Sequence, residues 1–197
     1  MSYKNKIRSR IQSGKLNTRV LKAQEKQQFW GEVNQTKPLT LMGIRQLVRV
    51  CRDAGEAHDD ALLKAIWHHV SVMGHITAEM VLIIQGVFRP ARMGAQKITR
   101  PLADFLFDLN EVVADSELNH TAWGQFFVRM VSKHLLEDNA KPNEINEEEA
   151  NWLIERVLSD GQYDYVEQML LPTLDQRATK MPESLKFQIE LLNGAIA

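Results

Sequence analysis

Hydrophobic residues recur at helical spacing along almost the whole chain, and glycine and proline are sparse. The stretch after Thr40 shows this pattern clearly, with apolar side chains at positions 41, 44, 47, 48 and 51. Because a helix completes a turn about every 3.6 residues, this spacing places the apolar side chains on one face. Alternating strand patterns joined by tight hairpin turns are missing from the sequence, so the pattern predicts an all-α fold.

About seven or eight helices are predicted, packed as a single multi-helix bundle. A helix over roughly 16–34 is followed by one from residue 41 to the glycine at 55. The others are predicted between residues 58 and 74, over 77–88, 102–113, 123–135 and 152–158, over 164–179 with an interruption at Pro172, and over 183–193. The helix over 77–88 is apolar on most sides, which is typical of a central helix.

Several predicted helices open with an apolar residue followed by a residue whose side chain can cap the first turn. These pairs are Leu39-Thr40, Ala57-His58, Ile76-Thr77, Leu118-Asn119, Ile145-Asn146 and Tyr163-Asp164. Two longer segments are also alike: residues 114–119 and 159–164 share an Asp, a small residue, a polar residue, an apolar residue and a cap. Their separation of 45 residues suggests a helix pair used twice.

Charge divides the chain into a basic arm and an acidic body. Residues 1–26 hold eight Lys or Arg and one acid, a net charge of +7, and the remaining 171 residues carry a net charge of −8. Hydrophobic residues make up 44% of the whole sequence, which is enough to build a core of ordinary size. We therefore expect a partly helical N-terminal arm over 1–37 and one helical bundle domain over 38–197.

The sequence predicts a cytoplasmic protein. Its longest uncharged apolar stretch runs from Met80 to Phe88, far shorter than the roughly 20 residues of a membrane-spanning helix. The charged N-terminus lacks the apolar segment of a secretory signal. Cys51 is the only cysteine, so no internal disulfide can form, and its place in an apolar helical pattern predicts a buried thiol.

Catalytic residues are not assigned, because the sequence lacks a nucleophile elbow, a phosphate-binding glycine loop and a dinucleotide-binding fingerprint. Glu117 and His120 form a Glu-x-x-His motif, but a di-iron bundle needs two such motifs and two further glutamates. A non-enzymatic role is therefore favoured.

Residues 160–167 carry the one pattern with ion-binding chemistry, since they match the second half of an EF-hand loop. The first half does not match, because Arg156 and Leu158 stand where calcium ligands are required. The ligands for calcium or another divalent cation would be Asp160, Asp164 and Glu167. Alternatively, Asp164 caps the following helix and Glu167 completes a capping box.

The same stretch resembles the TerB-like, tellurite-resistance-associated helical proteins over roughly residues 120–175. The resemblance is carried by the acidic helix start at 146–153 and by the Asp-Gly-x-apolar-Asp-x-x-Glu pattern at 160–167. It implies a compact helical bundle whose acidic end holds a divalent ion. It also implies an interaction module that binds a protein partner in a stress or phage-defence assembly. The sequence departs from a paired ion site at the glycine at 55, where Ala61 stands in place of the expected glutamate.

A nucleic-acid-associated protein is the alternative function. The basic arm and the loop over 89–100 would contact phosphates without reading sequence. The residues that would do so are Lys4, Lys6, Arg8, Arg10, Lys15, Arg89, Arg92, Lys97 and Arg100. The arm and loop can equally be solvated surface, and the arm can fold against the acidic body.

Overall fold

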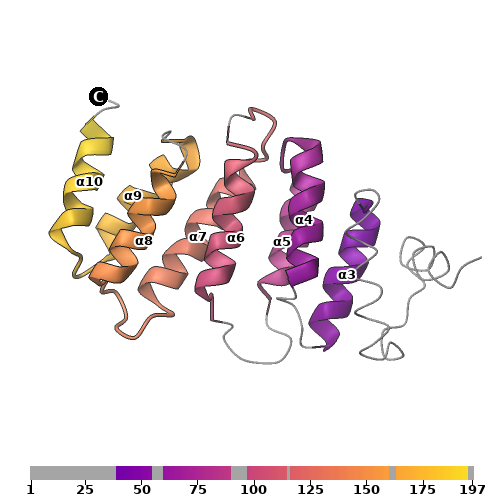
Figure 1. Cartoon of the computed structure of the whole chain (residues 1–197), viewed down its shortest axis with the longest axis horizontal. Coiled ribbons are helices and arrows are strands. Elements are labelled where there is room, and N and C mark those ends of the chain that lie inside the picture. The colour runs from indigo at the N-terminus through magenta and orange to yellow at the C-terminus, as the bar shows by residue number, and fades with distance from the viewer. Residues whose placement is uncertain (1–38, 55–59, 90–96, 115, 160–162, 195–197) are drawn as a thin grey trace, which may run out of the picture. The chain divides into compact units, whose positions relative to one another are not determined.

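The computed structural model describes residues 39–54, 60–89, 97–114, 116–159 and 163–194 (Figure 1). These residues form eight helices and no strand, which confirms the all-α prediction. The chain divides into two compact units, residues 1–96 and 97–197, and each is described by itself. The single domain predicted over 38–197 stays a prediction. None of the helices in the described ranges is long and apolar enough to cross a membrane.

Three helices are described in the first unit: α3 (Leu41–Ala54), α4 (Asp60–Met73) and α5 (Ala78–Val87). Helix α3 packs against both α4 and α5. Cys51 is buried in this unit, as its position in the apolar pattern predicted. Helix α5 carries a glycine, Gly86, at its contact with α3. A Cβ atom added there would lie 2.8 Å from Cγ1 of Val48, so this approach of the two helices depends on the missing side chain.

The second unit contains α6 (Arg100–Glu111), α7 (Ala122–Leu136), α8 (Glu147–Val157), α9 (Tyr165–Arg177) and α10 (Glu183–Gly194). Helix α7 packs against α6 and α9, while α10 packs against α8 and α9. Successive helices run in alternating directions, so the connections after α6 and after α8 lie at the same end of this unit (Figure 1). Residues 116–119 and 163–164, the described parts of the two segments whose sequences are alike, lie in these connections.

Aromatic side chains form the centre of the second unit. The ring of Phe127 is fully buried and lies edge-on to Phe107 and Trp123, with centroid distances of 5.0 and 6.0 Å. Phe107 also meets the ring of Trp152 edge-on at 5.7 Å. These rings come from α6, α7 and α8, so the cluster holds three helices together through contacts that such rings favour.

Polar contacts join α6 to α8 beside the aromatic cluster. The indole N–H of Trp152 donates to a carboxylate oxygen of Asp104 at 2.9 Å, and Arg156 donates to Asp108 at 2.6 Å. The guanidinium of Arg156 also lies over the ring of Phe107, 5.2 Å from its centroid. These contacts are charge-assisted and partly buried, so they align α8 on α6 more firmly than exposed ion pairs would.

Several predicted caps are confirmed. The Thr77 hydroxyl accepts the N–H of Met80, and the Asn146 and Asp164 side chains both take part in capping boxes. The predicted cap at Asn119 is wrong. Helix α7 begins later, with Thr121 at its N-cap, and the Asn119 amide instead donates to the carbonyl of Val113.

The sequence predicts that Pro172 interrupts the helix over 164–179, and this prediction is wrong. Helix α9 continues through it from Tyr165 to Arg177. Proline removes one backbone donor from the helix. The buried side chains of Leu171 and Leu174 flank it, and their packing offsets the lost hydrogen bond.

Replacing Gly86 with alanine should destabilise the protein by about 1 kcal/mol. The added methyl overpacks the contact with Val48 at a cost of about 1–3 kcal/mol, while the gain in helix propensity is about 1 kcal/mol. Urea unfolding of the full chain, followed by circular dichroism, measures the change in unfolding free energy. In a Val48→Ala background the same substitution should cost less, and an equal cost in both backgrounds would show that the two positions do not meet.

Candidate functional site

The start of α9 is built around two acidic side chains. Asp164 stands at the N-cap, where its Oδ1 accepts the backbone N–H groups of Val166 at 2.8 Å and Glu167 at 2.9 Å. The Glu167 carboxylate reaches back and accepts the N–H of Asp164 at 3.2 Å. This is the capping box that the sequence offered as the alternative to an ion site. It satisfies backbone donors that the first turn otherwise leaves unpaired.

A buried amide connects this cap to the rest of the unit. Asn110, in α6, is only 3% exposed. Its Nδ2 donates to Oδ2 of Asp164 at 2.5 Å, and its Oδ1 accepts the indole N–H of Trp123 at 3.1 Å. Because an indole N–H can only donate, these two contacts fix which way the amide points. Asn110 therefore joins α6, α7 and the start of α9.

A pocket of about 310 Å³ opens above this network. Asn110, Trp123 and Asp164 contribute to its lining, together with six residues between Ala114 and Thr121 and with the first residues of α9. The pocket belongs to the second unit alone. Its volume lies at the lower end of the range of ligand pockets, which is roughly 300–1,000 Å³.

Large apolar side chains are exposed at the same end of the unit. Tyr165 lines the pocket and is 70% exposed, and Leu118, between two lining residues, is 72% exposed. His120 also lines the pocket, and its Nδ1 accepts the backbone N–H of Ala122 at 3.2 Å. The neutral ring therefore carries its proton on Nε2. The pocket thus combines an apolar edge with polar groups of fixed orientation.

The predicted metal ligands divide between described and undescribed parts of the chain. Asp160 lies outside the described residues, while Asp164 and Glu167 lie together in the capping box. Among the residues that the structure describes, no group of three or more His, Cys, Asp or Glu side chains is arranged to hold a metal ion. The site at Asp160, Asp164 and Glu167 for calcium or another divalent cation therefore stays a prediction.

The predicted phosphate-binding residues divide in the same way. Lys4, Lys6, Arg8, Arg10, Lys15 and Arg92 lie outside the described residues. Arg89 and Lys97 are exposed. Arg100 pairs with Glu148 at 3.3 Å, and its guanidinium lies 5.3 Å from the ring centroid of Trp152. The side chain of Arg100 is therefore engaged within the fold.

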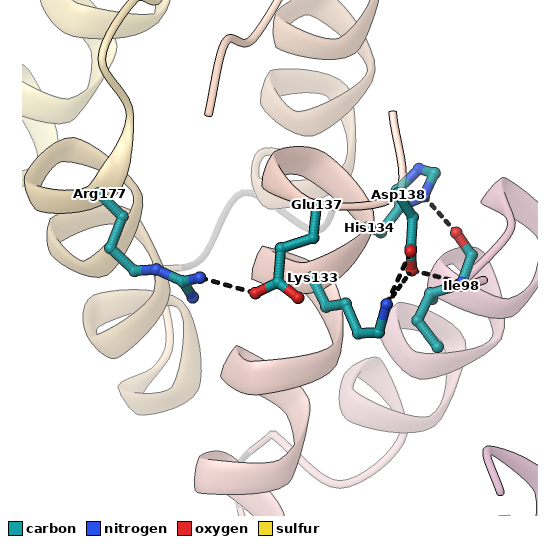
Figure 2. Close-up of polar contacts among 6 residues, drawn as sticks. All are labelled: Ile98, Lys133, His134, Glu137, Asp138 and Arg177. Atoms are coloured by element: carbon teal, nitrogen blue, oxygen red, sulfur yellow. Dashed lines mark hydrogen bonds and ion pairs between the residues drawn. The ribbon is translucent and has the colours of Figure 1, made fainter. Parts of the chain in front are cut away.

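A second polar cluster lies at the end of α7 (Figure 2). Asp138 accepts the backbone N–H of Ile98 at 2.7 Å and two bonds from the Lys133 ammonium, each 2.7 Å long. The Nδ1 of His134 donates to the Ile98 carbonyl at 2.7 Å. The backbone N–H and the carbonyl of Ile98 are thus both held by side chains at the end of α7, which fixes the chain as it enters α6. We assign this cluster a structural role.

Comparison of the chain with protein-family models, with curated proteins and with solved structures gives no match. The TerB-like resemblance therefore stays a prediction, and the site is interpreted from its own geometry.

The sequence had not singled out Asn110, Trp123 or Tyr165 as site residues. Asn110 carried a usable signal, because it is a polar residue within the apolar face formed by Leu106, Leu109 and Val113. A polar residue on a buried face needs a partner, but only the folded chain shows which one it has.

Exchanging Asn110 for aspartate tests the amide network. The Asn110→Asp side chain keeps an acceptor for Trp123 but turns a carboxylate oxygen toward Asp164. We expect the unfolding free energy at pH 7 to fall by about 2–3 kcal/mol, because a charge-assisted hydrogen bond becomes a repulsion. Urea unfolding measures this loss. The same exchange at exposed Asn151 should change stability by less than about 0.5 kcal/mol.

Ionisation of Tyr163 should make the stability of the protein depend on pH in the alkaline range. Burial, and then the negative charges of Glu167 and Asp164, raise the pKa of its phenol from 10.0 to about 12. The unfolded chain therefore loses this proton first, so the phenol's contribution to stability is complete below pH 10 and declines as the pH rises to 12.

The Tyr163→Phe variant should lack that decline. The difference in unfolding free energy between wild type and variant should fall across this window, as measured by urea unfolding at a series of pH values. The Tyr165→Phe variant, altered at an exposed position, should keep the decline caused by Tyr163. A constant difference between wild type and Tyr163→Phe would contradict the role of burial and of the two acids.

Proposed function

We propose that this chain is a non-enzymatic interaction protein whose second unit binds a segment of a partner protein. The observation that carries the proposal is the pocket between the 114–121 connection and the start of α9, with Leu118 and Tyr165 exposed at its edge. The TerB-like resemblance would place such an interaction in a cytoplasmic stress or phage-defence assembly.

The exposed side chains are of the kinds that anchor protein interfaces. Tyrosine is enriched among the residues that contribute most to binding, because its rigid ring buries a large area and its hydroxyl can form a hydrogen bond. A pocket beside such a ring offers a partner side chain a place to become fully desolvated. Exposed apolar groups beside a concave surface therefore support recognition of another protein.

The pocket walls support the same function because hydrogen bonds hold their side chains in place. Trp123 and Asn110 are almost completely buried, and their mutual hydrogen bond ties α6 to α7. Asp164 is fixed by the backbone of α9 and by the Asn110 amide. A partner that enters the pocket would meet a surface already in its bound shape, which lowers the entropic cost of binding.

The alternative, contact with nucleic-acid phosphates through the basic N-terminal arm and the loop over 89–100, stays a prediction. The pocket does not support that function, because the carboxylates of Glu117 and Asp164 line it and would repel phosphate.

A photo-crosslinking amino acid at position 118 tests the proposal. In cells that produce the full chain, we expect this position to capture a protein, because Leu118 is exposed and lies between two residues that line the pocket. Mass spectrometry identifies the product. The purified candidate should then bind wild type, and a Tyr165→Ala variant should bind it at least about tenfold more weakly, which is the loss expected of an interface anchor.

The matched control carries the same crosslinker at Asn151, which is exposed on α8 and does not line the pocket. A product common to positions 118 and 151 would be nonspecific. The absence of any product specific to position 118 would overturn the proposal.

A further inference from the structure

We infer that the pocket of the second unit receives a cationic side chain, lysine or arginine, from the partner segment. The inference rests on the proposed function and adds the chemistry of the ligand to it. It is based on three features of the pocket. Its lining is acidic, the backbone N–H groups at the start of α9 already have acceptors, and Tyr165 places an aromatic side chain at its edge.

The lining is acidic. The described residues that line the pocket include two carboxylates, Glu117 and Asp164, and neither lysine nor arginine. Glu117 is exposed and comes from the 114–121 connection, whereas Asp164 precedes α9. The two acidic residues therefore line the pocket from separate elements. A cation between them gains attraction from both sides, in a concave site where water screens charge less than on open surface.

An anionic ligand is disfavoured at the same place. The start of a helix normally attracts anions through its free N–H groups. Here the Asp164 carboxylate already accepts the N–H groups of Val166 and Glu167, and Glu167 accepts the N–H of Asp164. An incoming phosphate or carboxylate would have to displace these bonds and would meet two negative charges.

The size and edge of the pocket suit one long side chain. A volume of about 310 Å³ is small for a cofactor but leaves room for an extended aliphatic chain and its charged end. Tyr165 lines the pocket, and its exposed ring can stack on an ammonium or guanidinium group. Exposed Leu118 would then contact an apolar neighbour of that cation in the partner segment.

The alternatives differ in charge, so small probes distinguish them. Butylammonium and butylguanidinium imitate the two side chains, butyrate carries the opposite charge, and butanol is neutral. Each is titrated into the full ¹⁵N-labelled chain while backbone amides and indole N–H signals are recorded. We expect both cations to shift the signals of residues 116–121, of Tyr165 and of the Trp123 indole, and we expect butyrate and butanol to shift them less at equal concentration.

The Glu117→Gln variant tests the charge directly. It should bind butylguanidinium about two- to fivefold more weakly, because one ion pair at a partly exposed site is lost. Glu155→Gln, altered on the exposed face of α8, should bind as wild type does. Higher salt should weaken binding to wild type more than to Glu117→Gln.

Three results would overturn the inference: butyrate or butanol binding as well as the cations, equal binding by wild type and Glu117→Gln, or a response to calcium or magnesium chloride without one to the organic cations. The crosslinking experiment separates this failure from failure of the proposed function. A partner captured at position 118, together with a pocket indifferent to cations, would leave the interaction intact and refute only the cationic ligand. Cation binding without a captured partner would refute the interaction with a protein instead.

Discussion

The second unit depends on one buried amide. Asn110 lies on the apolar face of α6, accepts the indole N–H of Trp123 and donates to Asp164 in front of α9. Each of these groups would be costly to bury alone, because an unpaired polar group loses its hydrogen bonds to water. Together they satisfy one another. The same amide therefore holds three helices in register, orients the carboxylate that caps α9, and forms part of the wall of the pocket.

Other contacts hold the remaining parts of the second unit in place. The aromatic cluster of Phe107, Phe127 and Trp152 connects α6, α7 and α8 through edge-on ring contacts. At the far end of α7, Asp138 and His134 hold the peptide groups of Ile98 and so fix the start of α6 (Figure 2). Helix α6 is thus held by side chains at its beginning and by Asn110 near its end. The pocket-lining residues between Ala114 and Thr121 come soon after the end of this anchored helix.

The acids at the start of α9 show how a structural role shapes binding chemistry. Asp164 and Glu167 occupy the backbone donors that would otherwise attract an anion, and they leave negative charge behind. The pocket beside them gains a further carboxylate from Glu117. A helix start that usually suits phosphate is in this way converted into a surface suited to a positive charge. The exposed Tyr165 and Leu118 would add apolar contacts to the proposed protein partner.

The sequence by itself determined the helices that the structure describes, because their apolar spacing and caps are local properties of the chain. The helix predicted over 16–34 lies outside the described residues. Thr77, Asn146 and Asp164 were recognised as caps since each acts within its own first turn. The cap predicted at Asn119 is wrong because its side-chain amide donates to a carbonyl of the preceding connection. The interruption predicted at Pro172 is wrong because the tertiary packing of neighbouring leucines outweighs one missing backbone donor. The pocket was invisible in the sequence. Asn110 and Asp164 are 54 residues apart, and only tertiary packing brings a buried amide, an indole and a helix cap within hydrogen-bonding distance.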